Sequence, residues 1–417
     1  MLTRRSLLAT APLALGSLAL PRLARAAQPS SLRFLFVFAQ GGWDPTRVFA
    51  PEFRNDAFDM EPDAERAVAG GISFVDHAAR PSVRAFFEAH HARTTVFNGM
   101  LVRSIAHDIC TMLAMTGTTS GTVPDWPAIL GADLGREDAL PHLVLAGPSF
   151  PGPLGASVAR TGTSGQLDGL LSGGILANAD VPTGRLRSPS GAVLDRYLAR
   201  RAGAAVDGAR SGVSRALLEA HRDATRKAGR LKDLQWVLDF GASAALEDQA
   251  AVAVEALAMG VSRCVTMSSG TPFVWDTHAN NDALQSPLWE DLFAGLGRLM
   301  VMLEETPGVT AATLAEETVV VVLSELGRTP RLNGFLGKDH WPYTSAMVVG
   351  PGLIGDRTVG GHDSNGYGLE IDPVSGEPVE GAPALSAEAF GATLLAAAGV
   401  DPGEWVEGAS PIEGVIA

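Results

Sequence analysis

Acidic and imidazole side chains follow several short apolar runs of this chain. Glu325 and Arg328 come directly after Val319–Leu323, and His340 follows one loop later. Asp44 follows a similar apolar run and two glycines. A short apolar run bounded by polar residues predicts a buried strand of a parallel sheet, and ligands bind beyond the carboxyl ends of such strands. The pattern therefore predicts a polar site at one edge of a sheet.

Structural roles for the same residues remain open on local grounds. Glu325 and Arg328 could pair with each other and only close their loop, because ion pairs also gather at such places. Asp44 could equally be a loop aspartate before Pro45. Neither alternative is decided by the sequence.

Asp276 and His278 form a second candidate pair. Side chains two positions apart point the same way in an extended segment, so both could face one ion. A carboxylate oxygen with an imidazole nitrogen suits zinc, manganese or iron. Alternatively, Asp276 caps the helix that begins near Leu284, and His278 is a surface residue. His107 lies at the start of a further predicted helix, where the helix dipole favours an anion.

Strands and helices that would position these residues alternate along the chain. Apolar runs predict strands over 31–40, 94–98, 142–146, 262–267, 319–323 and 345–349. Helical spacing of apolar residues predicts helices over 84–91, 105–115, 288–303 and 387–398, the last with Ser386 as its N-cap. Loops and helices around 148–260 form a predicted insertion. Alternating strands and helices predict an α/β fold.

Composition limits the classes of function. Of the 417 residues, 46% are hydrophobic and 19% charged, which is typical of a globular protein with a large core. The formal net charge is −14, and removal of the four arginines of 1–27 takes it to −18. An acidic chain is a poor binder of nucleic acid or anionic membranes through general electrostatics. Cys110 and Cys264 allow one disulfide in an oxidising compartment.

The first 27 residues have the features of an export signal. Arg4 and Arg5 precede the apolar stretch Leu7–Leu20, and a small-x-small pattern follows at Ala24–Ala26. The stretch resembles a twin-arginine signal peptide, which implies the twin-arginine export machinery as a partner and a periplasmic or secreted location. An ordinary secretory signal or an uncleaved anchor is the alternative. We expect no membrane span in the mature protein.

Five short motifs, taken in order, resemble a known family. They are GGWD at 41–44, WDTHANN at 275–281, SELGRTPRLN at 324–333, KDHW at 338–341 and GGHD at 360–363. With the leader, they resemble the uncharacterised bacterial domain-of-unknown-function 1501 family, which is similar in fold to the alkaline phosphatase and sulfatase superfamily. The resemblance implies one domain over 28–417, built as a three-layer α/β/α sandwich with a mainly parallel central sheet. It also implies a metal centre at the carboxyl edge.

The resemblance also implies a ligand set for a divalent cation, which could be zinc, manganese, calcium or magnesium. The expected ligands are Asp44, Asp276, Glu325 and His340, with His278 as a fifth. His107 is expected as general base or nucleophile, and Arg328 as a clamp for an anionic group.

Two departures from the superfamily pattern limit what can be carried over. Glu325-Leu326-Gly327 stands where the superfamily has Asp-His-Gly, so one imidazole ligand is replaced by an aliphatic side chain. The position aligned with the sulfatase nucleophile is His107 and carries no hydroxyl. Two functions therefore stay open: an exported metal-dependent hydrolase of small anionic phosphate, phosphonate or sulfate esters, and a non-catalytic exported binding or assembly protein on a degenerate hydrolase scaffold.

Overall fold

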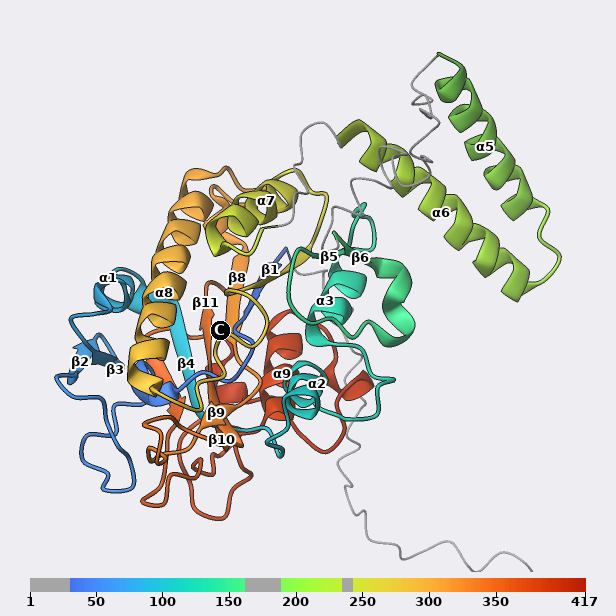
Figure 1. Cartoon of the computed structure of the whole chain (residues 1–417). Helices are drawn as coiled ribbons and strands as arrows, with labels where there is room; N and C mark the ends of the chain where they lie inside the picture. The colour runs from blue at the N-terminus through green and yellow to red at the C-terminus, as the bar shows by residue number, and fades with distance from the viewer. Residues whose placement is uncertain (1–30, 162–188, 235–242) are drawn as a thin grey trace, which may run out of the picture.

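An eight-stranded sheet forms the centre of the protein. The computed structural model describes residues 31–161, 189–234 and 243–417, so the predicted signal peptide lies outside the described residues. The strand order is β12-β4-β11-β8-β1-β7-β5-β6 (Figure 1). The strands are β1 (Arg33–Phe38), β4 (Thr94–Leu101), β5 (His142–Val144), β6 (Val158–Arg160), β7 (Cys264–Ser268), β8 (Thr318–Leu323), β11 (Tyr343–Val349) and β12 (Arg357–Gly360). Two small hairpins, β2 (Glu65–Ala69) with β3 (Ile72–Asp76) and β9 (Gly327–Arg328) with β10 (His340–Trp341), lie outside this sheet.

The sheet is mainly parallel, as predicted. Only β11 runs against its neighbours, β4 and β8. At the centre, β1 lies parallel to both β7 and β8, and Phe38 is paired with Ser268 on one side and Leu323 on the other. The three central strands therefore end at the same level, and the segments that follow them emerge side by side.

Alternate residues of β1 face two different cores, which is the signature of a sheet covered on both faces. Leu35 and Val37 belong to one apolar cluster, and Phe34, Phe36 and Phe38 to the other. The first cluster lies under α1 (Pro81–His90), α7 (Leu246–Ala258) and α8 (Asn281–Glu305). The second lies under α3 (Trp126–Leu134) and α9 (Ala387–Ala397), with α2 (His107–Thr116) packed on α9. This arrangement confirms the predicted α/β/α sandwich.

Most predicted elements are present with shifted ends. Helix α8 begins at Asn281, seven residues before the predicted start, and Pro287 lies inside it. Ser386 caps α9 as predicted, because its hydroxyl accepts a hydrogen bond from the Ala389 amide at 3.2 Å. The disulfide that the sequence left open is not formed, since Cys110 and Cys264 are both buried free thiols.

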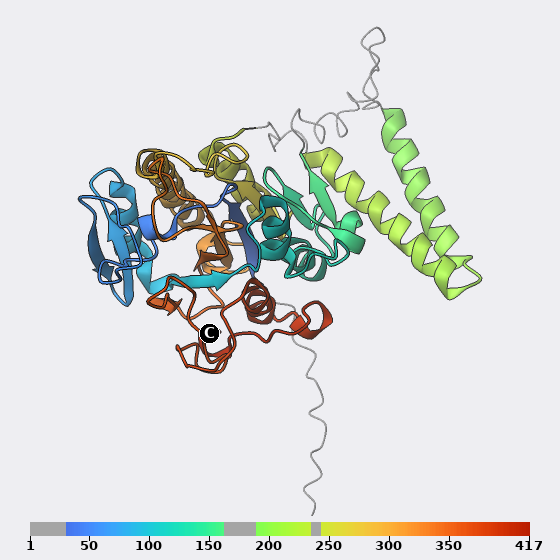
Figure 2. The same ribbon diagram turned by 60° about the horizontal axis from the view of Figure 1, so that its bottom comes forward.

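Within the predicted insertion, two long helices form a hairpin that projects from the body of the molecule (Figures 1 and 2). They are α5 (Pro189–Asp207) and α6 (Gly212–Leu234). One ion pair joins α6 to the body, between Arg226 and Glu137 at 2.7 Å. Loops predicted over 162–188 lie outside the described residues. None of the described helices is both long and apolar enough to span a membrane.

Candidate metal centre

Segments from five parts of the chain meet at the carboxyl edge of the sheet. The turn after β1 carries Gly41, the loop after β7 carries Asp276, and Glu325 directly follows β8. His107 is the first residue of α2. The β9–β10 hairpin pairs His340 with Arg328 and so returns His340 to the same edge. The predicted convergence of acids and imidazoles therefore exists, with a membership that differs from the predicted one.

Three side chains are close enough to share one cation. Ligand atoms of His107, Asp276 and His340 all lie within 4.8 Å of one another. His107 Nε2 is 3.5 Å from Asp276 Oδ2, and His340 Nε2 is 3.2 Å from Asp276 Oδ1. The two imidazole rings stand nearly perpendicular, with centroids 4.3 Å apart. One carboxylate thus lies between the Nε2 atoms of two imidazoles.

The far nitrogen of each imidazole is already held. Nδ1 of His107 lies 2.8 Å from Oε1 of Glu325, and Nδ1 of His340 lies 2.7 Å from the Ile105 carbonyl oxygen. Both partners are acceptors, so each Nδ1 carries a proton, and Nε2 is the atom of each ring that faces Asp276. Metal-bound histidines are oriented in this way. His107 Nε2 is buried and, among the described residues, has no hydrogen-bond partner.

Glu325 holds neighbouring parts of the site in place through hydrogen bonds. Its buried carboxylate accepts hydrogen bonds from the Gly41 amide at 2.7 Å and the Ser324 hydroxyl at 3.1 Å. The hydrogen bond from His107 to Glu325 raises the pKa of His107, although burial opposes the shift. Glu325 was predicted to bind the metal directly. That role stays a prediction; in this structure the Glu325 carboxylate holds the orientation of the His107 ring through their hydrogen bond.

The first glycine of the GGWD motif lets this turn approach the Asp276 loop. Gly41 has a φ of 120°, which L side chains rarely adopt. A Cβ at Gly41 would lie 2.7 Å from the Asp276 amide nitrogen and 2.9 Å from that of Trp275. The turn after β1 and the loop after β7 therefore pack backbone to backbone, and this contact holds Glu325 and Asp276 in one site.

Arg328 is a structural partner of Asp276. Its buried guanidinium donates to the carbonyl oxygens of Gly41, Gly42, Trp275 and Lys338 and to Asp276 Oδ1, the last at 2.7 Å. Every nitrogen of the group is engaged, so the predicted clamp for an anionic ligand has no free edge of N–H groups to use. Burial opposes ionisation of Asp276, but the hydrogen bond and charge of Arg328 outweigh it and lower the pKa of Asp276.

Asp44 lies in a separate network. Oδ2 accepts hydrogen bonds from Lys338 Nζ at 2.9 Å and Asn281 Nδ2 at 2.8 Å, and Oδ1 accepts from the Thr46 amide and hydroxyl. Burial would raise the pKa of Asp44, yet the charges of Lys338 and Arg47 hold it well below its usual range. Metal ligation by Asp44 stays a prediction, and it would require breaking a buried ion pair.

His278 lies at the exposed rim of the site. Its Nε2 is 3.1 Å from Asp276 Oδ1 and 2.9 Å from His340 Nε2, and its Nδ1 is 3.0 Å from Asp339 Oδ1. Asp276 and His278 thus share one side of their segment, as their spacing indicated. With nearly half of its side chain exposed, His278 is placed to contact a ligand that enters from solvent.

The family model described as "Protein of unknown function (DUF1501)" matches residues 31–407. The chain belongs to the DUF1501 family. This confirms the family that the five motifs indicated. No curated protein matches the chain.

Solved structures similar to this DUF1501 protein include members of the superfamily that the motifs resemble. A protein in the alkaline phosphatase superfamily from Vibrio parahaemolyticus has 9% identity and a TM-score of 0.39, covering 89% of this chain and 68% of its own. Ps i-CgsB in complex with k-i-k-neocarrahexaose has 10% identity and a TM-score of 0.37, covering 91% and 74%. A phosphonate monoester hydrolase of Agrobacterium radiobacter has 13% identity and a TM-score of 0.32, covering 91% and 78%. Similarity at this level supports no conclusion about chemistry.

Leu326 stands where the superfamily pattern has a histidine, so the DUF1501 site has no imidazole at position 326. Its side chain is buried in a small apolar cluster with Val102, Cys110, Leu113 and Ala114. Burial also raises the pKa of the Cys110 thiol to about 11, so no thiolate is available there. The Thr111 hydroxyl donates to the His107 carbonyl oxygen at 2.6 Å. No nearby hydroxyl or thiol on α2 is thus set up as a nucleophile.

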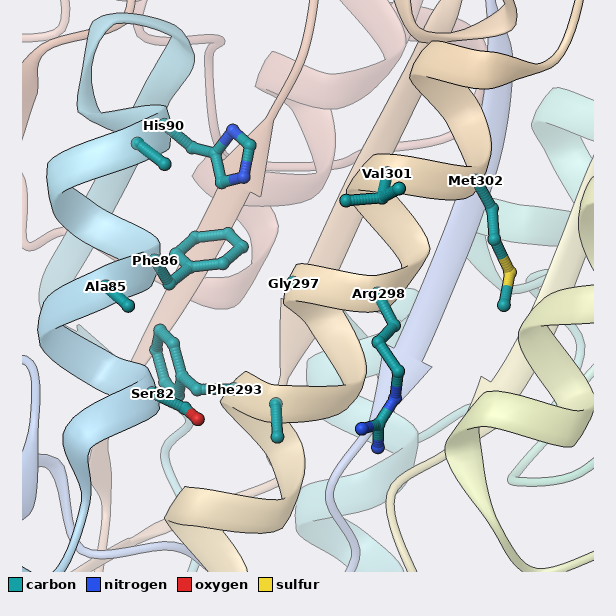
Figure 3. Close-up of a pocket in the computed structure, with 11 residues that line it drawn as sticks. Ser82, Ala85, Phe86, His90, Phe293, Gly297, Arg298, Val301 and Met302 are labelled. Atoms are coloured by element: carbon teal, nitrogen blue, oxygen red, sulfur yellow. The ribbon is translucent and has the colours of Figure 1, made fainter.

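A hollow between α1 and α8 is a poor alternative site. Figure 3 shows Phe86 and Phe293 facing each other from the two helices, with Val301 and Met302 further along α8. Among the described residues that line it, His90 and Arg298 are the ionisable ones. The hollow has no carboxylate and no second imidazole, so it lacks the groups that the edge of the sheet provides.

Proposed function

We propose that this protein is an exported metal-dependent hydrolase of anionic esters. His107, Asp276 and His340 would hold one divalent cation. The observation that carries the proposal is that the Nε2 atoms of two imidazoles converge on one carboxylate while each Nδ1–H is held elsewhere. Two nitrogens and one oxygen suit zinc, manganese or iron better than calcium or magnesium, which prefer oxygen ligands.

The donor set fits a catalytic site better than a closed structural one. Three protein ligands leave coordination positions for water and substrate, whereas structural zinc sites use four. A bound cation of this kind polarises an ester oxygen and lowers the pKa of a bound water toward about 7. Because α2 offers no hydroxyl nucleophile, we propose direct attack by water. His278, at the rim, would contact the ester group or the incoming water.

Metal content and ester hydrolysis test the proposal together. We expect about one divalent ion per chain in freshly purified mature protein, and hydrolysis of at least one phosphate, phosphonate or sulfate ester that chelation abolishes. Absence of a stoichiometric ion from protein produced with ample metal would refute the metal centre. A bound ion without hydrolysis of any ester would favour the non-catalytic alternative.

Asp276→Asn removes the central ligand with little change in shape. We expect metal affinity to fall at least about 100-fold, beyond the effect of losing an outer hydrogen bond. Arg328 keeps four carbonyl partners, so the free energy of unfolding in chelator should change by only about 1 kcal/mol. Asp133→Asn, at an exposed aspartate on α3, is the matched control. Equal metal affinity in both variants would exclude Asp276 as a ligand.

A further inference from the structure

A second hollow lies on the same edge of the sheet as the metal centre. It has a volume of about 540 Å³ and opens beyond the carboxyl ends of β1, β5, β6 and β7. Pockets of this size hold small organic molecules. Unlike the hollow between α1 and α8, it is built from the segments that follow parallel strands, where ligands bind in folds of this class.

Two chain segments line this hollow on one side and reach the metal centre within a few residues. Gln40 lines the hollow, and the next residue, Gly41, donates to Glu325. Thr271 and Pro272 line it as well, and the next residue, Phe273, packs its ring against His107 with centroids 5.2 Å apart. A ligand that reaches across this short loop would therefore contact both places.

Phe273 is held in an unusual conformation at this boundary. Its φ is 62°, a rare value for a bulky residue, and half of its surface is exposed. Backbone hydrogen bonds fix the turn, from the Val274 amide to Thr271 and from the Asp276 amide to Phe273. Strained residues of this kind cluster at ligand sites. The turn holds an aromatic ring in the open, next to the imidazole of the metal centre.

The lining of the hollow combines apolar surface, neutral polar groups and one cation. Leu145, Ala146, Pro148 and Pro272 provide apolar surface, and Arg160 is the one charged residue among the described residues that line it. Arg160 donates to the Gly147 carbonyl oxygen at 3.1 Å, which ties the guanidinium to the wall. In the described part of the chain no carboxylate forms a direct ion pair with it; burial lowers its pKa, and the charge of Asp125 opposes this shift. A guanidinium that forms no direct ion pair and stands beside an apolar surface suits an apolar ligand that carries an anion.

We infer that this hollow is the subsite for the organic part of the substrate, and that it selects an apolar group bearing its own negative charge, which pairs with Arg160. The role of the hollow in a reaction rests on the proposed hydrolase function, whereas the binding of an apolar anion in the hollow does not. The preferred substrate would then be an ester whose apolar, aromatic or aliphatic, portion carries a carboxylate or sulfonate in addition to the ester group.

Binding of anilinonaphthalene sulfonate, an apolar aromatic anion, tests the subsite without catalysis. We expect saturable binding to the full mature protein by fluorescence and calorimetry. Binding should be at least about tenfold weaker in Arg160→Gln and intermediate in Arg160→Lys, because a hydrogen bond between two charged groups is stronger than a neutral one. Arg136→Gln removes the same positive charge from another arginine, an exposed one, and is the charge-matched control.

A second control assigns the place of binding. Val301→Asp alters the apolar hollow between α1 and α8 and should leave the probe affinity unchanged. Loss of probe binding in Val301→Asp with full binding in Arg160→Gln would overturn the inference. Equal affinity of wild type, Arg160→Gln and Arg136→Gln would overturn it too.

Hydrolysis of matched esters gives a further readout. For zinc-loaded protein, we expect Arg160→Gln to raise KM about tenfold for carboxynaphthyl phosphate, with unchanged kcat, and to leave KM for naphthyl phosphate unaffected. Equal KM changes for both esters would contradict charge selection. If neither ester is hydrolysed, the proposed reaction fails, and the probe titration still decides whether the anion subsite exists.

Discussion

Asp44 and Asp276 both follow central strands at the same edge of the sheet, but their surroundings are opposite. Asp44 is fully buried, and both of its oxygens accept hydrogen bonds from Lys338, Asn281 and Thr46. Asp276 is 29% exposed and faces the Nε2 atoms of two imidazoles. The first carboxylate receives its counter-charge from the chain. The second is paired with Arg328 on one side only and leaves the other side open.

The comparison shows that residue type and strand position do not define a ligand. A buried ion pair is closed when its partners satisfy every lone pair, and a foreign cation would then have to displace one of them. A site that can bind an ion needs donors held in place by a second set of partners and turned toward a common point. Glu325 and the Ile105 carbonyl provide that second set here.

Removal of Asp44 should give the largest change in stability and tests whether Asp44 is a structural residue or a metal ligand. Asp44→Ala leaves the buried Lys338 ammonium without its carboxylate, so we expect the free energy of unfolding to fall by about 3–5 kcal/mol in chelator. Denaturant unfolding measures this loss. The double variant Asp44→Leu/Lys338→Met should regain much of it, because both buried charges are gone. Asp44→Ala protein that keeps its stability and loses its metal would show that Asp44 is a ligand after all.

The sheet was predictable because buried parallel strands are short, almost wholly apolar segments, as Val319–Leu323 is. β12 (Arg357–Gly360) was missed because Arg357 and Thr358 break that pattern at a sheet edge, where one side of the strand needs no apolar neighbour. The hairpin β9–β10 was missed because each of its strands has only two residues.

The sequence pointed to the edge of the sheet where the site lies, but not to which side chains meet there. Asp276 and His340 were predicted as ligands and His107 as general base or nucleophile, and the structure places the three side chains together. Whether an imidazole binds a metal depends on which nitrogen is held, and that follows from the distance between α2 and Glu325 in space. Asp44 and Asp276 look alike in sequence, since Lys338 becomes the partner of Asp44 only when the chain folds. No local pattern reveals that pairing.

Low pH tests the stability contributed by buried polar groups that, like Asp44, are enclosed by the chain. His142 on β5 is fully buried, with one nitrogen on the Thr266 hydroxyl at 2.8 Å, and burial lowers its pKa from 6.5 to about 3. Between pH 6.5 and 3 the unfolded chain binds a proton on His142 that the folded protein does not bind. The contribution of the buried neutral imidazole to the free energy of unfolding is therefore fully present above pH 6.5 and is lost as the pH falls toward 3. We expect a loss of about 1.4 kcal/mol per pH unit, or about 3 kcal/mol by pH 4.

Denaturant unfolding of chelated protein between pH 7 and 4 measures that loss. His142→Gln keeps a hydrogen-bonding side chain without the titrating ring and should flatten the pH dependence. His221→Gln, at an exposed position on α6, should keep the wild-type slope. An unchanged slope in His142→Gln would assign the acid sensitivity elsewhere, for example to the carboxylates of the closed network.

Glu325→Gln makes the smallest change and asks how the open site is held. The amide keeps one carbonyl oxygen for the Gly41 amide and the His107 Nδ1–H, but it loses the charge that stabilises this orientation. We expect metal affinity to fall about 10–100-fold, as for other groups that orient a metal-binding histidine, with about 1 kcal/mol or less of lost stability in chelator. Glu290→Gln, at a carboxylate that contacts Ser82, is the matched control.

The size of the Glu325→Gln effect decides between three roles. Metal affinity reduced far beyond 100-fold would make Glu325 a direct ligand, as its sequence position first indicated. Unchanged affinity would make it only a brace for the Gly41 turn. The intermediate value is expected because Oε1 is committed to both Gly41 and His107 and therefore acts on the ion through the imidazole. A chelator competition titration of the three proteins at one pH distinguishes these outcomes.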